Sequence, residues 1–114
     1  MKSKFIEDYQ FGRIEINNKT YTNDVILLGK EVLPEWWRER GHSLAKKDLE
    51  KVIDYNPDVL IVGTGNSGRM TVPRDLPKKL NLKVKSYPTK TAVKEYNKRL
   101  ENGKKIAGAF HLTC

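Results

Sequence analysis

The stretch that decides the fold runs from Asp58 to Gly68 and reads Asp-Val-Leu-Ile-Val-Gly-Thr-Gly-Asn-Ser-Gly. Its first part, Val59 to Val62, is a short unbroken run rich in β-branched residues, which predicts a strand buried on both faces of a parallel sheet. The Gly-x-Gly-x-x-Gly loop that follows, Gly63–Gly68, lets the backbone turn sharply and leaves its N–H groups uncovered, as anion-binding loops do. The stretch therefore predicts an α/β protein with an anion or cofactor pocket at the carboxyl end of a strand.

A dinucleotide-binding site does not fit the residues that come next. In such sites the glycine loop opens directly into a helix, whereas residues 69–73 read as extended chain. The acidic residue that would bind a ribose about 20 positions further on is also missing, because Lys83 and Lys85 stand there. We therefore expect no cofactor, and the loop remains a candidate for a simpler anion.

The N-terminal third predicts an antiparallel ribbon. Residues 13–16 alternate polar and apolar side chains, Asn17-Asn18 suits a tight turn, and residues 19–21 return. A more buried strand is expected over residues 24–28. Further on, Ser43 is the predicted N-cap of a helix that reaches about Asn56, with Leu49, Val52 and Ile53 on its inner side.

The C-terminal half alternates helices and strands. A short helix is predicted near residues 73–80, and a polar strand over residues 83–87 belongs near an edge of the sheet. Thr89 or Thr91 is expected to cap a helix that ends at about Asn102. Residues 106–112 form an apolar strand with three small residues, which suits a central position under a closely packed helix.

Composition limits the function classes. The chain has 114 residues, enough for one domain, and no apolar run approaches the roughly 20 residues of a membrane span. The start, Met-Lys-Ser-Lys-Phe, is not followed by the apolar segment of a signal peptide. The single cysteine, Cys114, cannot form an intramolecular disulfide. We expect a cytoplasmic protein without membrane insertion.

Charge is distributed unevenly along the chain. Residues 1–57 hold ten Lys/Arg and ten Asp/Glu, whereas residues 58–114 hold twelve Lys/Arg and four Asp/Glu, so the net charge of +8 lies in the second half. Lys90, Lys94 and Lys98 would form a stripe on one face of the last helix. Such a surface attracts anions, but no nucleic-acid fold signature accompanies it, and a solvated face is the expected role.

The order of these landmarks resembles a known family. They are Gly41-His42-Ser43, the Gly63-Thr64-Gly65 loop, Thr91-Ala92 with Tyr96-Asn97, and His111-x-Thr113-Cys114. The chain is similar to a small family of uncharacterised single-domain proteins that includes the adipogenesis-associated domain protein and a mitochondrial respiratory complex I assembly factor. The resemblance implies one domain over residues 1–114: a three-layer α/β fold around a mixed sheet, with the last strand central and antiparallel to its neighbours. It implies no enzyme activity.

The candidate site follows from strand direction. If the strands at residues 59–62 and 83–87 are parallel, their carboxyl ends meet at one sheet edge, beside the start of the last helix, where free N–H groups favour an anion. The predicted ligand-binding residues are Gly63, Thr64, Gly65, Asn66, Ser67, Gly68, Arg69, Thr89, Lys90 and Thr91. The alternative is a purely structural role, in which the glycines permit a tight turn and Asn66 and Ser67 make local hydrogen bonds.

His111 and Cys114 do not predict a catalytic or metal site. Residues three apart on a strand point to opposite faces, and the only other histidine, His42, leaves too few ligands for structural zinc. We expect His111 to be hydrogen-bonded near the pocket or the core.

The expected function is binding or assembly rather than catalysis. Trp36 and Trp37 are adjacent, so one should pack inward and the other should cover a surface where a protein partner could bind. The alternative is a small enzyme that acts on a phosphorylated or carboxylated metabolite at the Gly63–Gly68 edge. A weaker alternative is a basic nucleic-acid binder.

Overall fold

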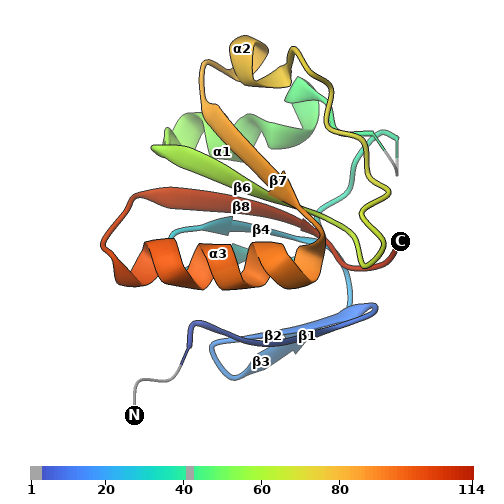
Figure 1. The fold of residues 1–114 in the computed structure, drawn as a ribbon, viewed down its shortest axis with the longest axis vertical. Coiled ribbons are helices and arrows are strands. Elements are labelled where there is room, and N and C mark those ends of the chain that lie inside the picture. Colours follow the sequence, from blue (N-terminus) through green and yellow to red (C-terminus); the bar gives the residue numbers. More distant parts are fainter. Residues whose placement is uncertain (1–3, 41–42) are drawn as a thin grey trace.

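A five-stranded mixed sheet forms the centre of the computed structural model, which describes residues 4–40 and 43–114 (Figure 1). Across the sheet the strands lie in the order β5 (Glu31–Leu33), β4 (Val25–Leu28), β8 (Ile106–His111), β6 (Val59–Thr64) and β7 (Lys83–Tyr87). The predicted strand at the glycine loop is thus β6, and all six of its residues are buried. The more polar β7 lies at an edge, as its sequence predicts.

The last strand, β8, is central, but its direction requires a correction. It runs antiparallel to β4 and parallel to β6, so it is antiparallel to only one of its two neighbours. The cause is the helical connection before it. The helix α3 (Thr89–Glu101) carries the chain from the end of β7 back along the sheet, and a crossover of this kind returns the next strand in the same direction.

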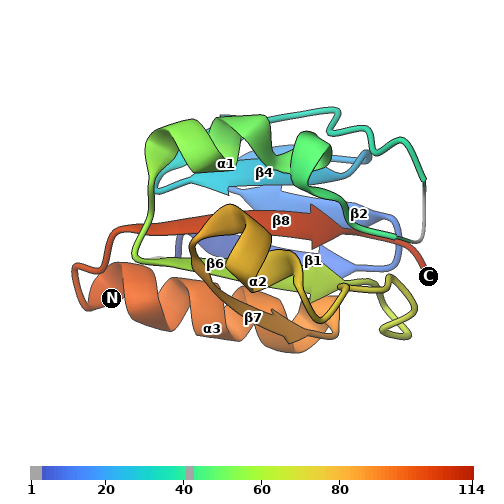
Figure 2. The same cartoon turned by 90° about the horizontal axis from the view of Figure 1, so that it is seen from above.

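Three layers result from this arrangement (Figures 1 and 2). The helices α1 (Glu50–Tyr55) and α2 (Leu76–Leu80) cover one face of the sheet, and α3 covers the other. The N-terminal strands β1 (Ile6–Gln10), β2 (Arg13–Ile16) and β3 (Lys19–Tyr21) form a separate antiparallel sheet in the layer of α3. The predicted N-terminal hairpin is therefore present as β2 and β3, with β1 as a third strand.

The turn between β2 and β3 has the geometry that its sequence predicts. Asn17 and Asn18 both adopt positive φ angles, 48° and 69°, as a two-residue hairpin turn of type I′ requires. The sheet is fixed to the rest of the molecule by Asn97 of α3. The Ile6 N–H group donates to Asn97 Oδ1 and Asn97 Nδ2 donates to the Ile6 carbonyl, each over 2.9 Å.

Apolar side chains of β6 alternate between two cores. Val59 and Ile61 lie in the core under α3, whereas Leu60 and Val62 lie in the core under α1 and α2. The small residues of β8 let α3 approach closely, since a Cβ atom on Gly108 would lie 3.0 Å from the Tyr96 ring. This contact explains why a glycine suits a central strand at this position.

Two predicted helix caps are wrong. The segment 46–49 forms a 3₁₀ turn (η1, Lys46–Leu49) before α1, and the cap is Ala45, whose N–H group donates to Asp48 Oδ2 over 3.0 Å. Ser43 instead forms a bridge with Thr71. The N-cap of α3 is Pro88, and Thr89 is the first residue of the helix. The hydroxyl of Thr89 bonds to other parts of the chain, described below.

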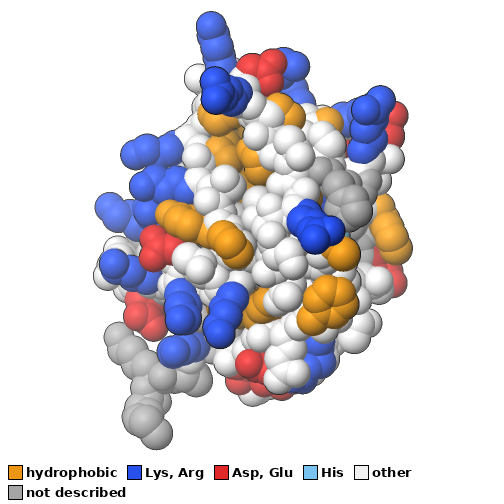
Figure 3. Space-filling view, turned by 45° about the vertical axis from the view of Figure 1, so that its right-hand side comes forward, with side chains coloured by type: hydrophobic (Ala, Val, Ile, Leu, Met, Phe, Trp, Pro, Cys, Tyr) orange, Lys and Arg blue, Asp and Glu red, His pale blue; other side chains and the backbone are white. Residues whose placement is uncertain are grey.

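Basic side chains gather on one side of the surface. Figure 3 shows lysine and arginine side chains along the left of the view, on the side where Figure 1 places α3. Trp37, by contrast, is one of two large apolar side chains that stay mostly exposed among the described residues, the other being Phe11.

Candidate functional site

The Gly63–Gly68 loop and the start of α3 lie together at one edge of the central sheet. Because β6 and β7 are parallel, their carboxyl ends meet there. The Gly65 N–H group donates to Thr89 Oγ1 over 2.8 Å, and the Thr89 N–H group donates to the Gly65 carbonyl over 3.0 Å. The structure therefore brings the two predicted parts of the site into direct contact.

Residues 112–114 lie against the loop and use its backbone donors. The Asn66 N–H group donates to the Thr113 carbonyl over 2.6 Å, and the Arg69 N–H group donates to the main-chain oxygen of Cys114 over 3.1 Å. Gly65 has a φ of +107°, and a Cβ atom built on it would lie 2.3 Å from the Cys114 carbonyl carbon. The glycine at position 65 thus makes room for the chain itself.

The predicted ligand-binding residues divide by exposure. Gly63, Thr64, Gly65 and Thr89 are buried, whereas Asn66, Ser67, Gly68, Arg69, Lys90 and Thr91 are exposed. The buried hydroxyls have partners in the chain, since Thr64 Oγ1 donates to the Tyr87 carbonyl over 3.0 Å. An anion at this edge would consequently meet exposed side chains, because the amides of Gly65, Asn66, Gly68 and Arg69 already donate to other atoms of the chain. Binding at this site stays a prediction.

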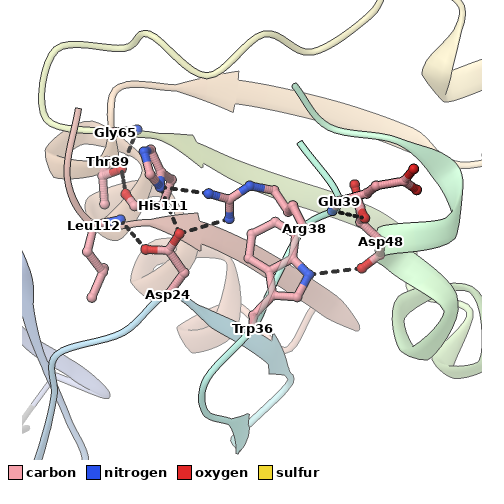
Figure 4. A network of polar contacts seen from close by, with 9 residues as sticks. All are labelled: Asp24, Trp36, Arg38, Glu39, Asp48, Gly65, Thr89, His111 and Leu112. Carbon is pink, nitrogen blue, oxygen red and sulfur yellow. Dashed lines mark hydrogen bonds and ion pairs between the residues drawn. The ribbon is translucent and has the colours of Figure 1, made fainter. Parts of the chain in front are cut away.

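A buried polar cluster of Asp24, Arg38 and His111 lies next to Gly65 and Thr89 (Figure 4). Arg38 Nη1 lies 2.8 Å from Asp24 Oδ2, and His111 Nδ1 lies 2.7 Å from the same oxygen. Arg38 Nη2 lies 3.0 Å from His111 Nδ1. The side chains are only 5%, 15% and 7% exposed for Arg38, Asp24 and His111. Burying a charged group without a partner destabilises the folded state, so each of these three residues depends on the other two for its partners.

Asp24 is the centre of this cluster. Burial alone would raise its pKa, but hydrogen bonds from His111, from the Leu112 N–H group and from Arg38 outweigh burial and hold the pKa below its ordinary value. The Leu112 N–H group donates to Asp24 Oδ1 over 2.8 Å. Because the ionised carboxylate only accepts hydrogen bonds, we assign the hydrogen on His111 Nδ1 to the bond with Asp24.

Thr89 connects the cluster to the loop. Its hydroxyl donates to the His111 carbonyl over 2.6 Å and accepts from the Gly65 N–H group. Tyr9, from the N-terminal sheet, donates to the Leu112 carbonyl over 2.8 Å. Burial, with the negative charge of Asp24, raises the pKa of Tyr9, so this hydroxyl remains a donor at neutral pH. Strands distant in sequence are thus joined at residues 111–112.

The two tryptophans divide as their adjacency predicts. Trp36 is buried, and Trp37 is 76% exposed. The Arg38 guanidinium lies over the Trp36 ring, 4.7 Å from its centroid, and Trp36 Nε1 donates to the Asp48 carbonyl over 2.9 Å. The segment that carries Trp37 is therefore fixed on both sides of it.

His111 is hydrogen-bonded at the edge of the core, which confirms its prediction. Cys114 is exposed. Within residues 4–40 and 43–114, no three His, Cys, Asp or Glu side chains group as metal ligands would. His42, the other histidine of the sequence, lies outside the described residues, as does Gly41.

Asp24 and Arg38 are the site residues that sequence reasoning missed. Neither belongs to a motif: Asp24 precedes an apolar strand, and Arg38 follows two tryptophans. Each lies more than 70 positions from His111, so their association depends on the pairing of β4 with β8. The weak available signal was an acidic residue directly before a buried strand.

Known structures resemble the whole chain. The conserved hypothetical protein PH1505 of Pyrococcus horikoshii is 29% identical, with a TM-score of 0.76 and complete coverage of both chains. The protein MT938 is 25% identical, with a TM-score of 0.78 over 98% of this chain and 100% of that one. A protein of Bordetella pertussis, described as a Mth938-like domain, shares the fold, with 17% identity and a TM-score of 0.69 over 96% of this chain and 85% of that one.

Two further findings concern membrane-spanning helices and family membership. In the part of the chain that the structure describes, every helix is too short or too polar to cross a membrane. A family model matches residues 6–111, nearly the whole length, and that family has no specific function attached to it. The chain belongs to the family described as protein of unknown function (DUF498/DUF598).

Proposed function

We propose that this chain is a cytoplasmic binding or assembly-type protein that contacts a protein partner through the surface around Trp37. Its resemblance to a family with a respiratory complex I assembly factor and the adipogenesis-associated domain protein supports an assembly role. The observation that carries the proposal is the 76% exposure of Trp37 on an otherwise fixed segment. Exposed tryptophans of this kind are enriched among the residues that dominate protein interfaces.

A groove of about 400 Å³ lies beside Trp37 and supports this assignment. Its lining includes the apolar Leu33 and Pro34. Acidic residues outnumber basic ones there, three to one: Glu35, Asp48 and Glu50 against Lys51. An apolar side chain of a partner, with a basic residue next to it, matches this combination. Trp36 provides a rigid wall of the groove, since its ring and its Nε1 group are both held in place.

The buried polar cluster supports binding over catalysis. A general acid or base acts near neutral pH when its pKa is shifted toward that range, whereas the pKa of Asp24 is lowered away from it. The oxygens of Asp24 are engaged with Arg38, His111 and the Leu112 amide. Through Arg38 and its contact with Trp36, the cluster positions the segment that presents Trp37.

Trp37→Ala is expected to weaken the partner complex by about 2 kcal/mol or more, roughly 30-fold in Kd, because a buried aromatic anchor is lost. The first measurement is affinity capture from a cell extract, comparing the proteins retained by the wild type and by the variant. Isothermal titration with the purified partner then gives the two Kd values.

Phe11→Ala is the matched control, because Phe11 is also mostly exposed (61%) but lies in the turn after β1. This variant should retain the partner at wild-type affinity. Equal retention by the Trp37 and Phe11 variants would contradict the proposed surface.

A second candidate is a small-anion site at the Gly63–Gly68 edge, either for binding alone or for an enzyme that acts on a phosphorylated or carboxylated metabolite. It is favoured by the exposed, cationic side chains of Arg69 and Lys90 beside the loop. Because the amides of Gly65, Asn66 and Arg69 already have partners, these side chains would supply the contacts.

Arg69→Ala is expected to weaken binding of inorganic phosphate about tenfold or more, since a charge-assisted contact is removed. Chemical-shift changes of the loop amides during a phosphate titration give the affinity. Arg74→Ala is the control, an arginine beyond the loop. If the loop amides do not respond to phosphate in the wild type, the anion site is wrong.

A further inference from the structure

The groove beside Trp37 carries a local negative charge. Its charged lining consists of three carboxylates and one ammonium group, on Glu35, Asp48, Glu50 and Lys51. Both carboxylate oxygens of Asp48 already accept backbone N–H groups. By contrast, no ion pair among the described residues involves Glu35, Glu50 or Lys51. Two carboxylates of the groove are therefore available to a cationic ligand.

The basic residues elsewhere in the chain do not cancel this local charge. The net charge of +8 belongs to residues 58–114, whereas every residue that lines the groove lies between positions 26 and 52. Lys46 and Lys47 line a different hollow, and Lys47 is paired with Glu39. Because exposed charges are screened beyond about 8–10 Å at ordinary salt concentrations, the carboxylates that line the groove decide which ligand charge it attracts.

Glu35 is the least compensated of these carboxylates. It also lines a second hollow of about 220 Å³, whose other lining residues, at positions 20–23 and 34, carry no charge. Its φ of +57° lies in the left-handed region, which residues other than glycine, asparagine and aspartate disfavour. The Trp36 N–H group holds the following chain by donating to the Asp24 carbonyl over 2.8 Å. The fold thus places a free carboxylate beside Trp37 in a backbone conformation that does not suit glutamate.

The exposed ring of Trp37 attracts a cation as well. The face of an indole ring carries negative charge density, and the cations found over it in proteins are more often guanidinium than ammonium groups. The chain contains such a pair one residue away, where the Arg38 guanidinium lies 4.7 Å from the centroid of the Trp36 ring. Trp37 is 76% exposed and has no cation over its ring among the described residues. The carboxylates and the indole face therefore favour the same kind of ligand.

Arginine matches this combination better than lysine does. The guanidinium group is planar, so it can stack on an aromatic ring while it donates two parallel hydrogen bonds to one carboxylate. An ammonium group is a compact and more strongly hydrated charge, which cannot make both contacts in this way. Leu33 and Pro34, which also line the groove, provide apolar contacts for the residue next to the arginine.

On the basis that Trp37 marks the partner surface, as proposed above, we propose that the groove binds an arginine side chain of the protein partner. The guanidinium group stacks on Trp37 and pairs with Glu35. The charge of Glu50 adds to the attraction, and that of Lys51 opposes it.

Two short peptides test the ligand chemistry, acetyl-Gly-Leu-Arg-Gly-amide and the same peptide with citrulline in place of arginine. Citrulline has nearly the same shape as arginine but no charge. Titrations at low ionic strength are followed by NMR at the indole N–H resonance of Trp37. The arginine peptide should bind the wild type about tenfold more tightly than the citrulline peptide, and at least threefold more tightly than a lysine peptide.

Glu35→Asn should reduce the preference for arginine over citrulline to about threefold or less, because it removes the paired carboxylate. Asparagine tolerates a positive φ, so the turn is retained, and circular dichroism checks the fold. Lys51→Gln should tighten binding of the arginine peptide about twofold, a gain that damage to the fold would not produce. Lys83→Gln is its matched control, since it changes the net charge equally but lies on β7, at the opposite edge of the sheet from β5. This control should leave the Kd unchanged.

Equal binding of the arginine and citrulline peptides, or no binding of either, would overturn the proposal. If Trp37→Ala still lost the captured protein, the partner surface would stand and only its choice of arginine would be wrong. A preference for arginine in a groove whose Trp37→Ala variant retains the captured protein would instead contradict the partner surface. Equal binding of the lysine peptide would remove the role of the planar group. Self-association of the wild type that is lost with Trp37→Ala would assign the groove to a second copy of the chain and overturn the proposal.

Discussion

Replacement of Asp24 by alanine is expected to lower the free energy of unfolding by about 3–5 kcal/mol, because it breaks a buried ion pair from one side. Arg38, with a side chain only 5% exposed, would lose the carboxylate that lies 2.8 Å from its Nη1 atom. His111 Nδ1 and the Leu112 N–H group would lose the same acceptor residue. Urea denaturation at neutral pH, followed by circular dichroism, measures the change.

Asp8→Ala is the matched control for this experiment. Asp8 also pairs with an arginine, Arg13, over 3.0 Å, but both side chains are at least 40% exposed. An exposed pair of this kind contributes about 0–1 kcal/mol, so its loss should be small. If Asp24→Ala costs no more than Asp8→Ala, the buried cluster does not stabilise the fold as inferred.

The pKa of Asp24 predicts how the same contribution depends on pH. Its folded-state pKa lies below the ordinary value of 3.8, so the unfolded chain takes up a proton first as the pH falls. The stabilisation is therefore fully present above that ordinary value and is lost as the pH falls through the lowered folded-state pKa. Asp24→Asn should remove this part of the acid dependence while preserving the shape of the side chain.

Local sequence patterns predicted the elements of this fold because each pattern reports a local cause. The apolar run at residues 59–62 became a strand buried on both faces, and Asn17-Asn18 became a hairpin turn because asparagine tolerates positive φ. The direction of β8 relative to β6, by contrast, has no local cause in the sequence. It depends on where α3 returns the chain, and no residue of β8 encodes that direction.

The candidate site likewise has one part that local sequence predicts and another that depends on how the strands are arranged. Contact between Gly65 and Thr89 could be predicted from the sequence, since parallel strands end at one edge. The association of Asp24 with His111 could not, because 87 positions separate them and only the register of β4 against β8 brings them together. Residues 112–114 follow β8, so their packing against the loop amides also depends on where β8 ends. The sequence alone does not show this packing, and it therefore predicts a loop whose amides are open to an anion.

Gly65→Ala is expected to destabilise the fold by about 3 kcal/mol or more, because two costs add. At a φ of +107° the backbone adopts a conformation that side chains disfavour, and the new Cβ atom would meet the Cys114 carbonyl carbon at 2.3 Å and the Thr113 oxygen at 2.8 Å. These neighbours are backbone atoms, which cannot move aside without breaking the hydrogen bonds that residues 113 and 114 accept from Asn66 and Arg69.

Gly103→Ala separates these two costs. Gly103 also has a positive φ, +76°, but nothing lies within 4 Å of the position its Cβ atom would take. This variant should therefore cost only the backbone strain, about 1–2 kcal/mol. The difference between the two variants in urea denaturation measures the steric cost of displacing residues 113 and 114, and faster amide hydrogen exchange at Asn66 and Arg69 in Gly65→Ala would accompany it. Equal costs for the two variants would mean that the contact between the glycine loop and residues 113–114 contributes nothing to stability, and the loop would then be free to open its amides to an anion.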